Sequence, residues 1–328
     1  MIRVLIVCRY KEAFPSHITP FITEQGGAVN KMDGYIVNYF TIKGSGFLSY
    51  FTQVKELKKR IKEFKPDIIH AHYGLSGLTA VLQRKVPVII TFHNGEVDTF
   101  LGNLFSSIAS LFAKHTIYVA QHIYNRTYFK PKSNYTIIPC GINIEDCNIT
   151  EQKVARKLLG FDEQKKYILF GGAFDNLRKN YKVIKEALKL DGRMTVKTEL
   201  GDDYGDIVCI EMNGLTRGEC VLRMCACDLF MLPSKSEGSP QALKEAMTCN
   251  CPIVATDIAD IKHLLGNLPG HYICSFEPED VAKKIKLALD FKGRTNGRKR
   301  IIELGLTNEQ VAKKIISIYN QVLEKLHE

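Results

Sequence analysis

The sequence predicts an α/β fold of two doubly wound units in tandem. Short apolar segments alternate with segments of helical periodicity through most of the chain, which is the pattern of parallel sheets with crossover helices. The apolar segments are continuous rather than alternating, as strands buried on both faces of a sheet usually are. A polar stretch at residues 148–152 separates two such series, so we expect a linker near residue 150 and a ligand-binding cleft between the units.

The first unit, which we place at residues 1–150, begins with a strand at the N-terminus. The apolar stretch after Arg3 is only five residues long and meets the polar segment 9–12, so we expect a strand rather than a signal peptide. The expected strands are residues 3–8, 35–40, 68–72, 87–91, 116–119 and 135–139. The expected helices lie near residues 20–31, 51–65, 75–84, 99–113 and 121–126.

The second unit, which we place at residues 151–306, repeats this alternation. Its expected strands are residues 167–170, 194–198, 206–210, 229–232, 253–256 and 272–274, with helices between them. A C-terminal helix follows at 307–328 and starts with the capping-box spacing of Thr307 and Gln310. It carries one apolar face, so we expect it to pack back on the first unit; this face consists of Val311, Ile315, Tyr319, Val322 and Leu326.

Length and composition exclude several classes of protein. With 328 residues, the chain is long enough for one large or two ordinary domains. Apolar residues make up 45% and charged residues 24%, which excludes a disordered or fibrous chain. No apolar run is long enough to span a bilayer. The ten cysteines are scattered, and we expect them to be reduced thiols of a cytoplasmic protein.

The formal charge of +10 is concentrated in the first half. Residues 1–150 carry 17 Lys and Arg against 10 Asp and Glu, whereas residues 151–328 carry 28 against 25. Such a surface can face nucleic acid, an anionic membrane or a phosphorylated substrate. We find no nucleic-acid motif and expect no nucleic-acid partner. The segment 51–65 has an apolar stripe among many lysines, so it is either a peripheral membrane contact or a helix packed on the sheet with a solvated outer face.

The most informative segment follows the expected strand 229–232. We expect a polar loop and then a helix, with Ser239 as N-cap and Pro240 as first helical residue. Gly238 leaves room for a ligand, and the amides from Gly238 through Gln241 to Ala242 form a site for an anion.

Two carboxylates accompany this anion site. Glu237 lies in the loop and Glu245 lies one and a half turns into the helix, so both can border one cavity. Ionised carboxylates only accept hydrogen bonds, so a ligand with both phosphate and hydroxyl groups fits, as a sugar nucleotide does. The alternative is a capped helix with two solvated glutamates.

The motif Glu-Gly-x-Pro-x-x-x-x-Glu-Ala-Met, preceded by Leu-Pro-Ser, resembles the donor-binding signature of glycosyltransferase family 4. The resemblance is strongest at residues 228–260 and clear at 66–96 and 136–142. It implies retaining enzymes with two Rossmann-like domains in the GT-B arrangement, with a cleft between them. By this resemblance Glu245 holds the ribose hydroxyls of the donor, and Glu237 contacts hydroxyls of the donor sugar.

The resemblance also points to cations that stabilise the departing diphosphate. The family usually has Gly-Arg after the strand that corresponds to 167–170, and a lysine about five residues later. Lys179 matches that lysine, whereas Ala173 or Phe174 stands at the arginine, so Arg178 is a candidate replacement. The alternative is that Arg178 and Lys179 are solvated charges at the start of a helix.

Histidines end two strands of the first unit. The segment 91–96 resembles the family's Thr-x-His-Gly, with Asn94 in the place of glycine, and implies that His93 lies near the transferred sugar. His70 and His72 resemble the family's His-x-His. They are either hydrogen-bonded strand-end residues or, less simply, metal ligands.

We expect neither a metal nor a bound cofactor. The chain contains no Asp-x-Asp, the motif with which metal-dependent transferases of the other main fold hold an ion on the diphosphate. The pairs Cys225/Cys227 and Cys249/Cys251 have C-x-C spacing without histidines, so we expect buried thiols, and we expect Asn250 between the latter to take a left-handed cap conformation. The family's glycine pair after the first strand is replaced by the loop 9–17, so the resemblance does not identify the acceptor.

These observations together predict a metal-independent, retaining hexosyltransferase-type glycosyltransferase of polysaccharide biosynthesis. We expect a nucleotide-sugar donor, with UDP-sugar first, and a glycan or lipid-linked saccharide acceptor. We expect the protein in the cytoplasm or peripherally at the inner face of the cell membrane. The alternatives are a sugar-nucleotide epimerase of the same fold, a nucleotide-sugar-binding protein without catalysis, and an NAD-dependent dehydrogenase.

Overall fold

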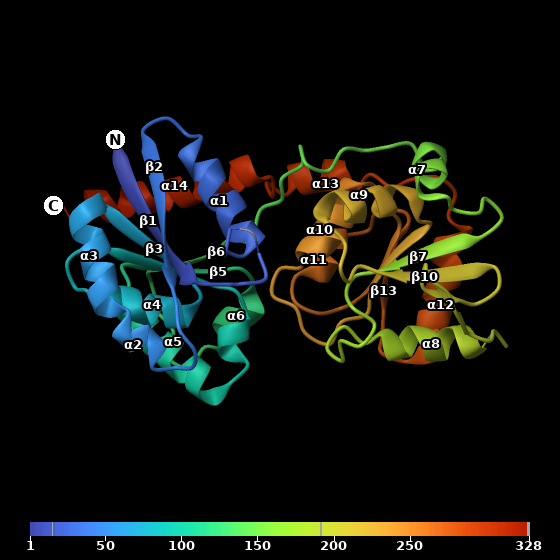
Figure 1. Cartoon of the computed structure of the whole chain (residues 1–328), viewed down its shortest axis with the longest axis horizontal. Coiled ribbons are helices and arrows are strands. Elements are labelled where there is room, and N and C mark those ends of the chain that lie inside the picture. The colour runs from blue at the N-terminus through green and yellow to red at the C-terminus, as the bar shows by residue number, and fades with distance from the viewer. Residues whose placement is uncertain (15, 191, 327–328) are drawn as a thin grey trace. The chain divides into compact units, whose positions relative to one another are not determined.

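A computed structural model describes residues 1–14, 16–190 and 192–326 of the chain. Pro15 of the loop 9–17 and the last two residues of the expected C-terminal helix therefore lie outside the described residues. The chain divides into two compact units (Figure 1). Residues 1–141 and 306–328 form the first unit, and residues 142–305 form the second.

The first unit is a parallel sheet with the strand order β2-β1-β3-β4-β5-β6. Its strands are β1 (Ile2–Arg9), β2 (Tyr35–Ile42), β3 (Ile68–His72), β4 (Val88–Phe92), β5 (His115–Tyr118) and β6 (Tyr135–Ile137). Its helices are α1 (Pro20–Asn30), α2 (Ser49–Thr52), α3 (Val54–Phe64), α4 (Gly74–Val81), α5 (Phe100–Phe112), α6 (Gln121–Arg126) and α14 (Asn308–Glu324), with a 3₁₀ turn at Gly95–Val97.

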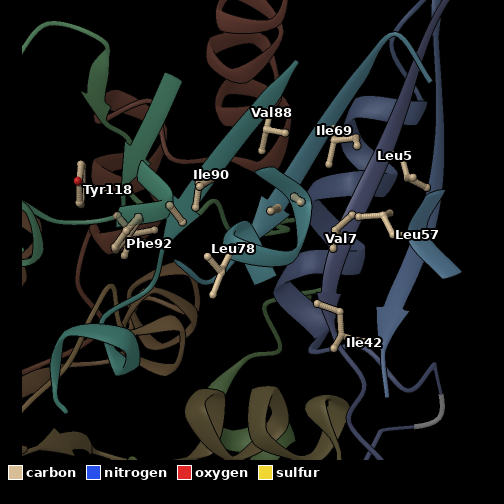
Figure 2. Packing of buried hydrophobic residues seen from close by; sticks show 14 of the residues in the cluster. Leu5, Val7, Ile42, Leu57, Ile69, Leu78, Val88, Ile90, Phe92 and Tyr118 are labelled. Carbon is tan, nitrogen blue, oxygen red and sulfur yellow. The ribbon is translucent and has the colours of Figure 1, made fainter. Parts of the chain in front are cut away.

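Side chains on opposite faces of this sheet belong to two separate cores, because successive side chains of a strand point to opposite faces. Leu5 and Val7 of β1 pack in a cluster with residues of α3, α4 and α5 (Figure 2). Val4 and Ile6 pack in a second cluster with residues of α1 and α14. The continuous apolar character of β1 follows, since both of its faces are covered.

Helix α14 begins as the sequence predicts. Thr307 and Gln310 form a reciprocal capping box, and Val311 and Tyr319 are buried in the second of these cores. The helix ends at Glu324, so Leu326 lies beyond it and is 47% exposed, contrary to its expected place on the buried face. Within the described residues, no helix is long and apolar enough to cross a membrane.

The expected helix 51–65 is two helices, because the chain breaks at Gln53 between α2 and α3. The apolar residues Leu57, Ile61 and Phe64 of α3 are buried against the sheet. The lysines of α3 remain on its exposed outer face.

The second unit is a mostly parallel sheet with the strand order β13-β12-β11-β7-β10-β9-β8. Its strands are β7 (Lys166–Phe170), β8 (Val196–Lys197), β9 (Asp202–Asp203), β10 (Ile207–Glu211), β11 (Leu229–Leu232), β12 (Ile253–Thr256) and β13 (His271–Cys274). Its helices are α7 (Gln152–Leu159), α8 (Tyr181–Leu190), α9 (Arg217–Ala226), α10 (Gln241–Thr248), α11 (Ile261–Leu265), α12 (Pro278–Asp290) and α13 (Gly297–Glu303).

One expected strand of this unit is wrong in length and direction. Instead of a parallel strand at 194–198, the structure has the short strand β8 paired antiparallel with β9, which in turn pairs antiparallel with β10. Only four residues separate β8 from β9, which is too few for the crossover helix that parallel strands need.

The strand order of the second sheet reverses direction between β7 and β11. The chain starts the sheet at β7, extends it on one side through β10, and then returns to add β11 on the other side. Ligands of open α/β sheets bind outside the carboxyl ends of strands at such a switch point. The loops that follow β7 and β11 are therefore the first place to look for a site.

Candidate functional site

An ion pair joins the two loops at this switch point. Lys179 follows β7 and Glu237 follows β11, and the lysine Nζ lies 2.6 Å from the glutamate Oε1. Both side chains are largely buried, with exposed fractions of 15% and 9%. The structure thus brings together two of the predicted site residues. A cation and a carboxylate here can serve the diphosphate and the hydroxyl groups of one ligand.

Gly172 leaves room for the Lys179 side chain. A Cβ atom at position 172 would stand 2.8 Å from Cγ of Lys179, closer than nonbonded carbons approach. The lysine stem therefore occupies the space that a side chain at 172 would fill. The turn after β7 needs glycine at this position because Lys179 crosses it on the way to Glu237.

Arg178 is not part of this ion pair. Its side chain is exposed, its amide donates to Asn176 Oδ1, and its carbonyl accepts a hydrogen bond from the amide of Lys235 at 2.8 Å. This backbone contact joins the loop after β7 to the loop after β11. It also places the exposed Lys235 beside Arg178 as a further cation that sequence reasoning missed.

The helix after Glu237 begins one residue later than expected. Helix α10 starts at Gln241, and Pro240, which we expected inside the helix, is the N-cap in extended conformation. Ser239, expected as the N-cap, lies one residue before Pro240, and its hydroxyl accepts a hydrogen bond from Nζ of Lys244 at 2.9 Å. The anion site from Gly238 to Gln241 remains a prediction.

Lys244 was missed by sequence reasoning, although a lysine among the apolar positions of α10 was a signal. Its side chain is completely buried, which is rare for lysine without a partner. The carboxyl oxygens of Asp260, after β12, are also buried; burial raises the pKa of this carboxyl, and the charge of Lys244 lowers it in part. Lys244 thus fixes Ser239, two residues after Glu237, to the helix that follows.

Glu245 meets an arginine from a neighbouring helix. Nε of Arg217 lies 3.2 Å from Oε1 of Glu245, and the same guanidinium lies 3.4 Å from Asp146 Oδ2. Arg217 is the first residue of α9, which a capping box of Thr216 and Glu219 initiates. Glu245 therefore has a cationic partner and retains acceptor capacity for hydroxyl groups. No spacing rule connects residues 217 and 245, so this pair could not be predicted from the sequence.

In the first unit, His93 lies among aromatic and polar side chains at the end of β4. Its Nε2 lies 3.0 Å from Nδ1 of His72, its Nδ1 lies 3.7 Å from Cys140 Sγ, and its ring packs against Phe21 and Tyr73. The imidazole is only half-buried. These contacts fix the ring while leaving part of it open to solvent.

Glu96 holds the backbone beneath His93. Its Oε1 accepts hydrogen bonds from the amide of His93 at 2.9 Å and from the amide of Gly74 at 3.3 Å. The carboxyl is buried, and burial raises its pKa to about 7 although backbone amides favour the anion. One carboxylate thus connects the ends of β3 and β4. Sequence reasoning missed Glu96, although its position three residues after His93 was a signal that it could contact the His93 backbone.

His70 and His72 are hydrogen-bonded residues at the end of β3, one of the two readings that the sequence left open. His70 bonds Tyr319 Oη through Nδ1 and Thr91 Oγ1 through Nε2, each at 2.7 Å. Burial lowers the pKa of His70 to about 3 and that of His72 well below its usual value. Both are neutral at physiological pH. His70 therefore serves to dock α14 on the sheet.

The backbone is unusual directly after β3 and β4. Tyr73 has φ of 71° and Asn94 has φ of 104°, values that L residues rarely adopt. Asn94 stands where the family usually has glycine, and this conformation explains that preference. Such strain is often kept at functional loops.

The cysteines are free and buried, as expected, including the pairs Cys225/Cys227 and Cys249/Cys251. Asn250 adopts the predicted left-handed conformation with φ of 55°. Groups of three or more His, Cys, Asp or Glu side chains that could hold a metal ion do not occur in the described part of the chain.

Solved structures share this fold over the whole chain. Sucrose-phosphate synthase from Thermosynechococcus elongatus superimposes with a TM-score of 0.79 at 16% identity and covers 99% of this chain and 100% of its own. Anabaena Alr3699/HepE in complex with UDP gives 0.73 at 14% identity, covering 98% of this chain and 100% of its own. The protein thus has the GT-B fold with its two Rossmann-like sheets.

The sequence matches two family models. The model described as Glycosyltransferase Family 4 matches residues 7–146, and that described as Glycosyl transferases group 1 matches residues 214–305. TuaC of Bacillus subtilis, a glycosyltransferase assigned to teichuronic acid biosynthesis, is 23% identical over 65% of this chain. That match spans 58% of the length of TuaC. This chain belongs to glycosyltransferase family 4, as its motif predicts.

Proposed function

We propose that this glycosyltransferase moves a sugar from a nucleotide-sugar donor, with UDP-sugar first, to a glycan or lipid-linked saccharide, with retention of configuration and without a metal ion. The observation that carries the proposal is the ion pair between Lys179 and Glu237, which joins the loops after β7 and β11. A buried cation beside a buried carboxylate suits a ligand that carries both a diphosphate and a hydroxylated sugar.

Each predicted residue has a chemical task in this proposal. Lys179 stabilises the charge that develops on the departing diphosphate, together with amides at the start of α10. Glu237 accepts hydrogen bonds from the sugar, and Glu245 accepts them from the ribose. Arg178 and Lys235 add positive charge at the same edge of the sheet.

The first unit supplies the acceptor side. His93 is the proposed catalytic residue there, since its imidazole or its carbonyl can stabilise positive charge at the anomeric carbon. Glu96 is a positioning residue, because it holds the His93 amide. Retention and the assignment as a hexosyltransferase-type enzyme rest on the resemblance of the motif to the family alone.

We propose that the protein works in the cytoplasm, where its free thiols stay reduced. The sequence suggested a membrane contact through residues 51–65. Because the apolar residues of α3 are buried, only its lysines can meet lipid headgroups, so we propose for α3 an electrostatic contribution and no insertion.

A ligand screen tests the proposed function. Melting temperatures are measured with UDP, GDP, ADP, UDP-sugars and NAD, and the stabilising donor is then followed for slow release of free sugar in EDTA. Stabilisation by a UDP-sugar and EDTA-resistant release are expected. Stabilisation by NAD alone would indicate a dehydrogenase, conversion to an epimeric nucleotide sugar would indicate an epimerase, and binding without turnover on any acceptor would indicate a non-catalytic protein. A strict requirement for Mg²⁺ or Mn²⁺ would contradict metal independence.

A further inference from the structure

Helix α5 in the first unit presents an uncovered apolar surface. Phe100 at its start is 67% exposed and Phe112 at its end is 70% exposed, and Leu101 and Leu111 beside them are more than half exposed. The inner side of the helix packs on α4 and the sheet through residues such as Ala109 (Figure 1). Soluble proteins commonly expose single apolar side chains, but large contiguous patches mark interaction sites.

The segment that follows α6 widens this surface. The amide of Tyr128 donates to Asn103 Oδ1 at 3.2 Å, and the hydroxyl of Ser110 donates to the Phe129 carbonyl at 3.3 Å, so this segment runs along α5. The rings of Tyr128 and Phe100 lie 5.9 Å apart. Tyr128 and Phe129 are each about half exposed. We call the exposed set the α5 surface; it consists of Phe100, Leu101, Leu111, Phe112, Tyr128 and Phe129.

A groove with a basic rim continues the α5 surface. It has a volume of about 580 Å³ and lies between the last turns of α4 and α5, where Leu82, Phe112 and Leu326 supply apolar walls. Cationic side chains stand around it, namely Arg84, Lys85 and Lys114. An apolar floor with a positively charged rim matches an amphiphile that has an anionic head.

The charge of the surrounding chain has one sign. No Asp or Glu occurs from residue 99 to residue 144, whereas this stretch contains four Lys and Arg. Arg126 pairs with Asp98, but Lys114 and Lys132 are exposed and have no ion pair in the described part of the chain. Lys114 lies two residues after Phe112 and Lys132 lies three residues after Phe129, so each lysine is close in sequence to an exposed phenylalanine of this surface.

We infer that the α5 surface binds an anionic lipid bilayer. Aromatic and aliphatic side chains enter the headgroup boundary, while the adjoining lysines and Arg84 contact lipid phosphates. A polar protein partner would not need six exposed apolar side chains. In a symmetric dimer through this surface, the lysines and Arg84 of one copy would face those of the other, and their like charges would repel. The inference adds a membrane contact to the acceptor side of the proposed function, yet it does not depend on which sugar or acceptor is used.

Vesicle sedimentation with the full chain tests the inference without any substrate. The vesicles contain phosphatidylcholine alone or with phosphatidylglycerol, at low and high salt. The variant L111S/F112S removes exposed apolar side chains, and its matched control L158S/L177S does the same in the second unit, where Leu158 and Leu177 are 68% and 87% exposed. Two further variants each remove three positive charges: K85Q/K114Q/K132Q near the α5 surface, and K58Q/K59Q/K62Q on α3 for comparison.

The wild type is expected to bind vesicles that contain phosphatidylglycerol, and less so at high salt. L111S/F112S should weaken partitioning by about tenfold or more, because burying a large apolar side chain is worth about 1.5–3 kcal/mol, while L158S/L177S should bind as the wild type. K85Q/K114Q/K132Q should weaken binding more than the α3 variant.

Three results would overturn the inference. The first is a wild type that does not bind phosphatidylglycerol vesicles at low salt, and the second is equal binding by L111S/F112S and its control. The third is a wild-type dimer in light scattering that L111S/F112S converts to a monomer, since a second copy would then cover the α5 surface. Melting temperature with UDP, measured on the same samples, separates failure of this inference from failure of the proposed function.

Discussion

Nζ of Lys179 lies 2.6 Å from Oε1 of Glu237, although 58 residues separate them in the sequence. The pair connects the loops at the carboxyl ends of two adjacent strands, β7 and β11. Each loop thereby fixes the other. Removing one partner of a buried ion pair commonly costs about 3–5 kcal/mol, so the proposed donor site and the stability of the second unit are coupled.

Gly172→Ala should disturb this ion pair while both charged residues stay unsubstituted. The added Cβ would stand 2.8 Å from Cγ of Lys179, so the lysine must leave its present path to Glu237. We expect UDP-sugar binding to weaken roughly tenfold, by about the worth of one charge-assisted hydrogen bond, as measured by calorimetric titration. Gly27→Ala in α1, where nothing lies within 4 Å of the new Cβ, is the control and should bind normally. Unchanged affinity of the Gly172 variant would show that the path of Lys179 is unimportant.

Glu245→Ala should weaken nucleotide binding by roughly tenfold to a hundredfold, since hydrogen bonds to a charged partner are worth about 1.5–3 kcal/mol. UDP and GDP titrations measure the effect. The exposed Glu163 offers a matched control, because Glu163→Ala removes the same charge from a surface loop of the same unit. Because Arg217 loses its contact with Glu245 as well, the melting temperature of the ligand-free variant has to be compared. Equal affinities for wild type and Glu245→Ala would contradict the proposal that Glu245 binds the ribose hydroxyls.

Glu96→Gln should change how stability depends on pH. Folded Glu96 keeps its proton up to a pKa of about 7, whereas the unfolded side chain releases it near 4.5. Between these values the folded state binds more protons, so this residue makes the free energy of unfolding fall as pH rises, and its effect is constant above about pH 7. Glutamine keeps the acceptor for the amides of His93 and Gly74 but cannot ionise.

Urea unfolding of both proteins across this range tests that prediction. The variant should gain stability relative to the wild type from about pH 4.5 to 7, by a total on the order of 3 kcal/mol. Other buried groups, such as His70, titrate in both proteins and cancel in the difference. A constant difference at every pH would show that the pKa of Glu96 is the same in the folded and the unfolded protein.

Tyr319→Phe should destabilise the first unit and leave the donor site intact. It removes the hydroxyl that lies 2.7 Å from Nδ1 of His70, and so leaves a buried ring nitrogen without that partner. The expected loss is about 1–3 kcal/mol in the free energy of unfolding. Tyr272→Phe, which removes an exposed hydroxyl in the second unit, should cost much less. A change in UDP affinity for Tyr319→Phe would contradict the assignment of His70 to structure.

Local patterns allowed much of the fold to be predicted. The buried strands, the capping box at Thr307 and the left-handed Asn250 depend on neighbours within a few residues, and the structure has them. The motif around Glu237 and Glu245 indicated the family for the same reason, since the loop and helix that carry it are contiguous. The predictions were wrong where a short segment is compatible with two structures. The segment at β8 forms an antiparallel hairpin instead of a parallel strand, and the expected helix 51–65 is broken at Gln53.

The sequence by itself determined the alternation of strands and helices and the family, and it supplied the residues that we propose for binding a sugar nucleotide. The tertiary structure alone decided that Lys179 pairs with Glu237, that Arg217 reaches Glu245 and that Lys244 is buried. These contacts join residues far apart in the chain, so they depend on strand order and helix packing rather than on spacing. Burial is likewise a property of the packed chain, and it is burial that moves the pKa of Glu96 to about 7.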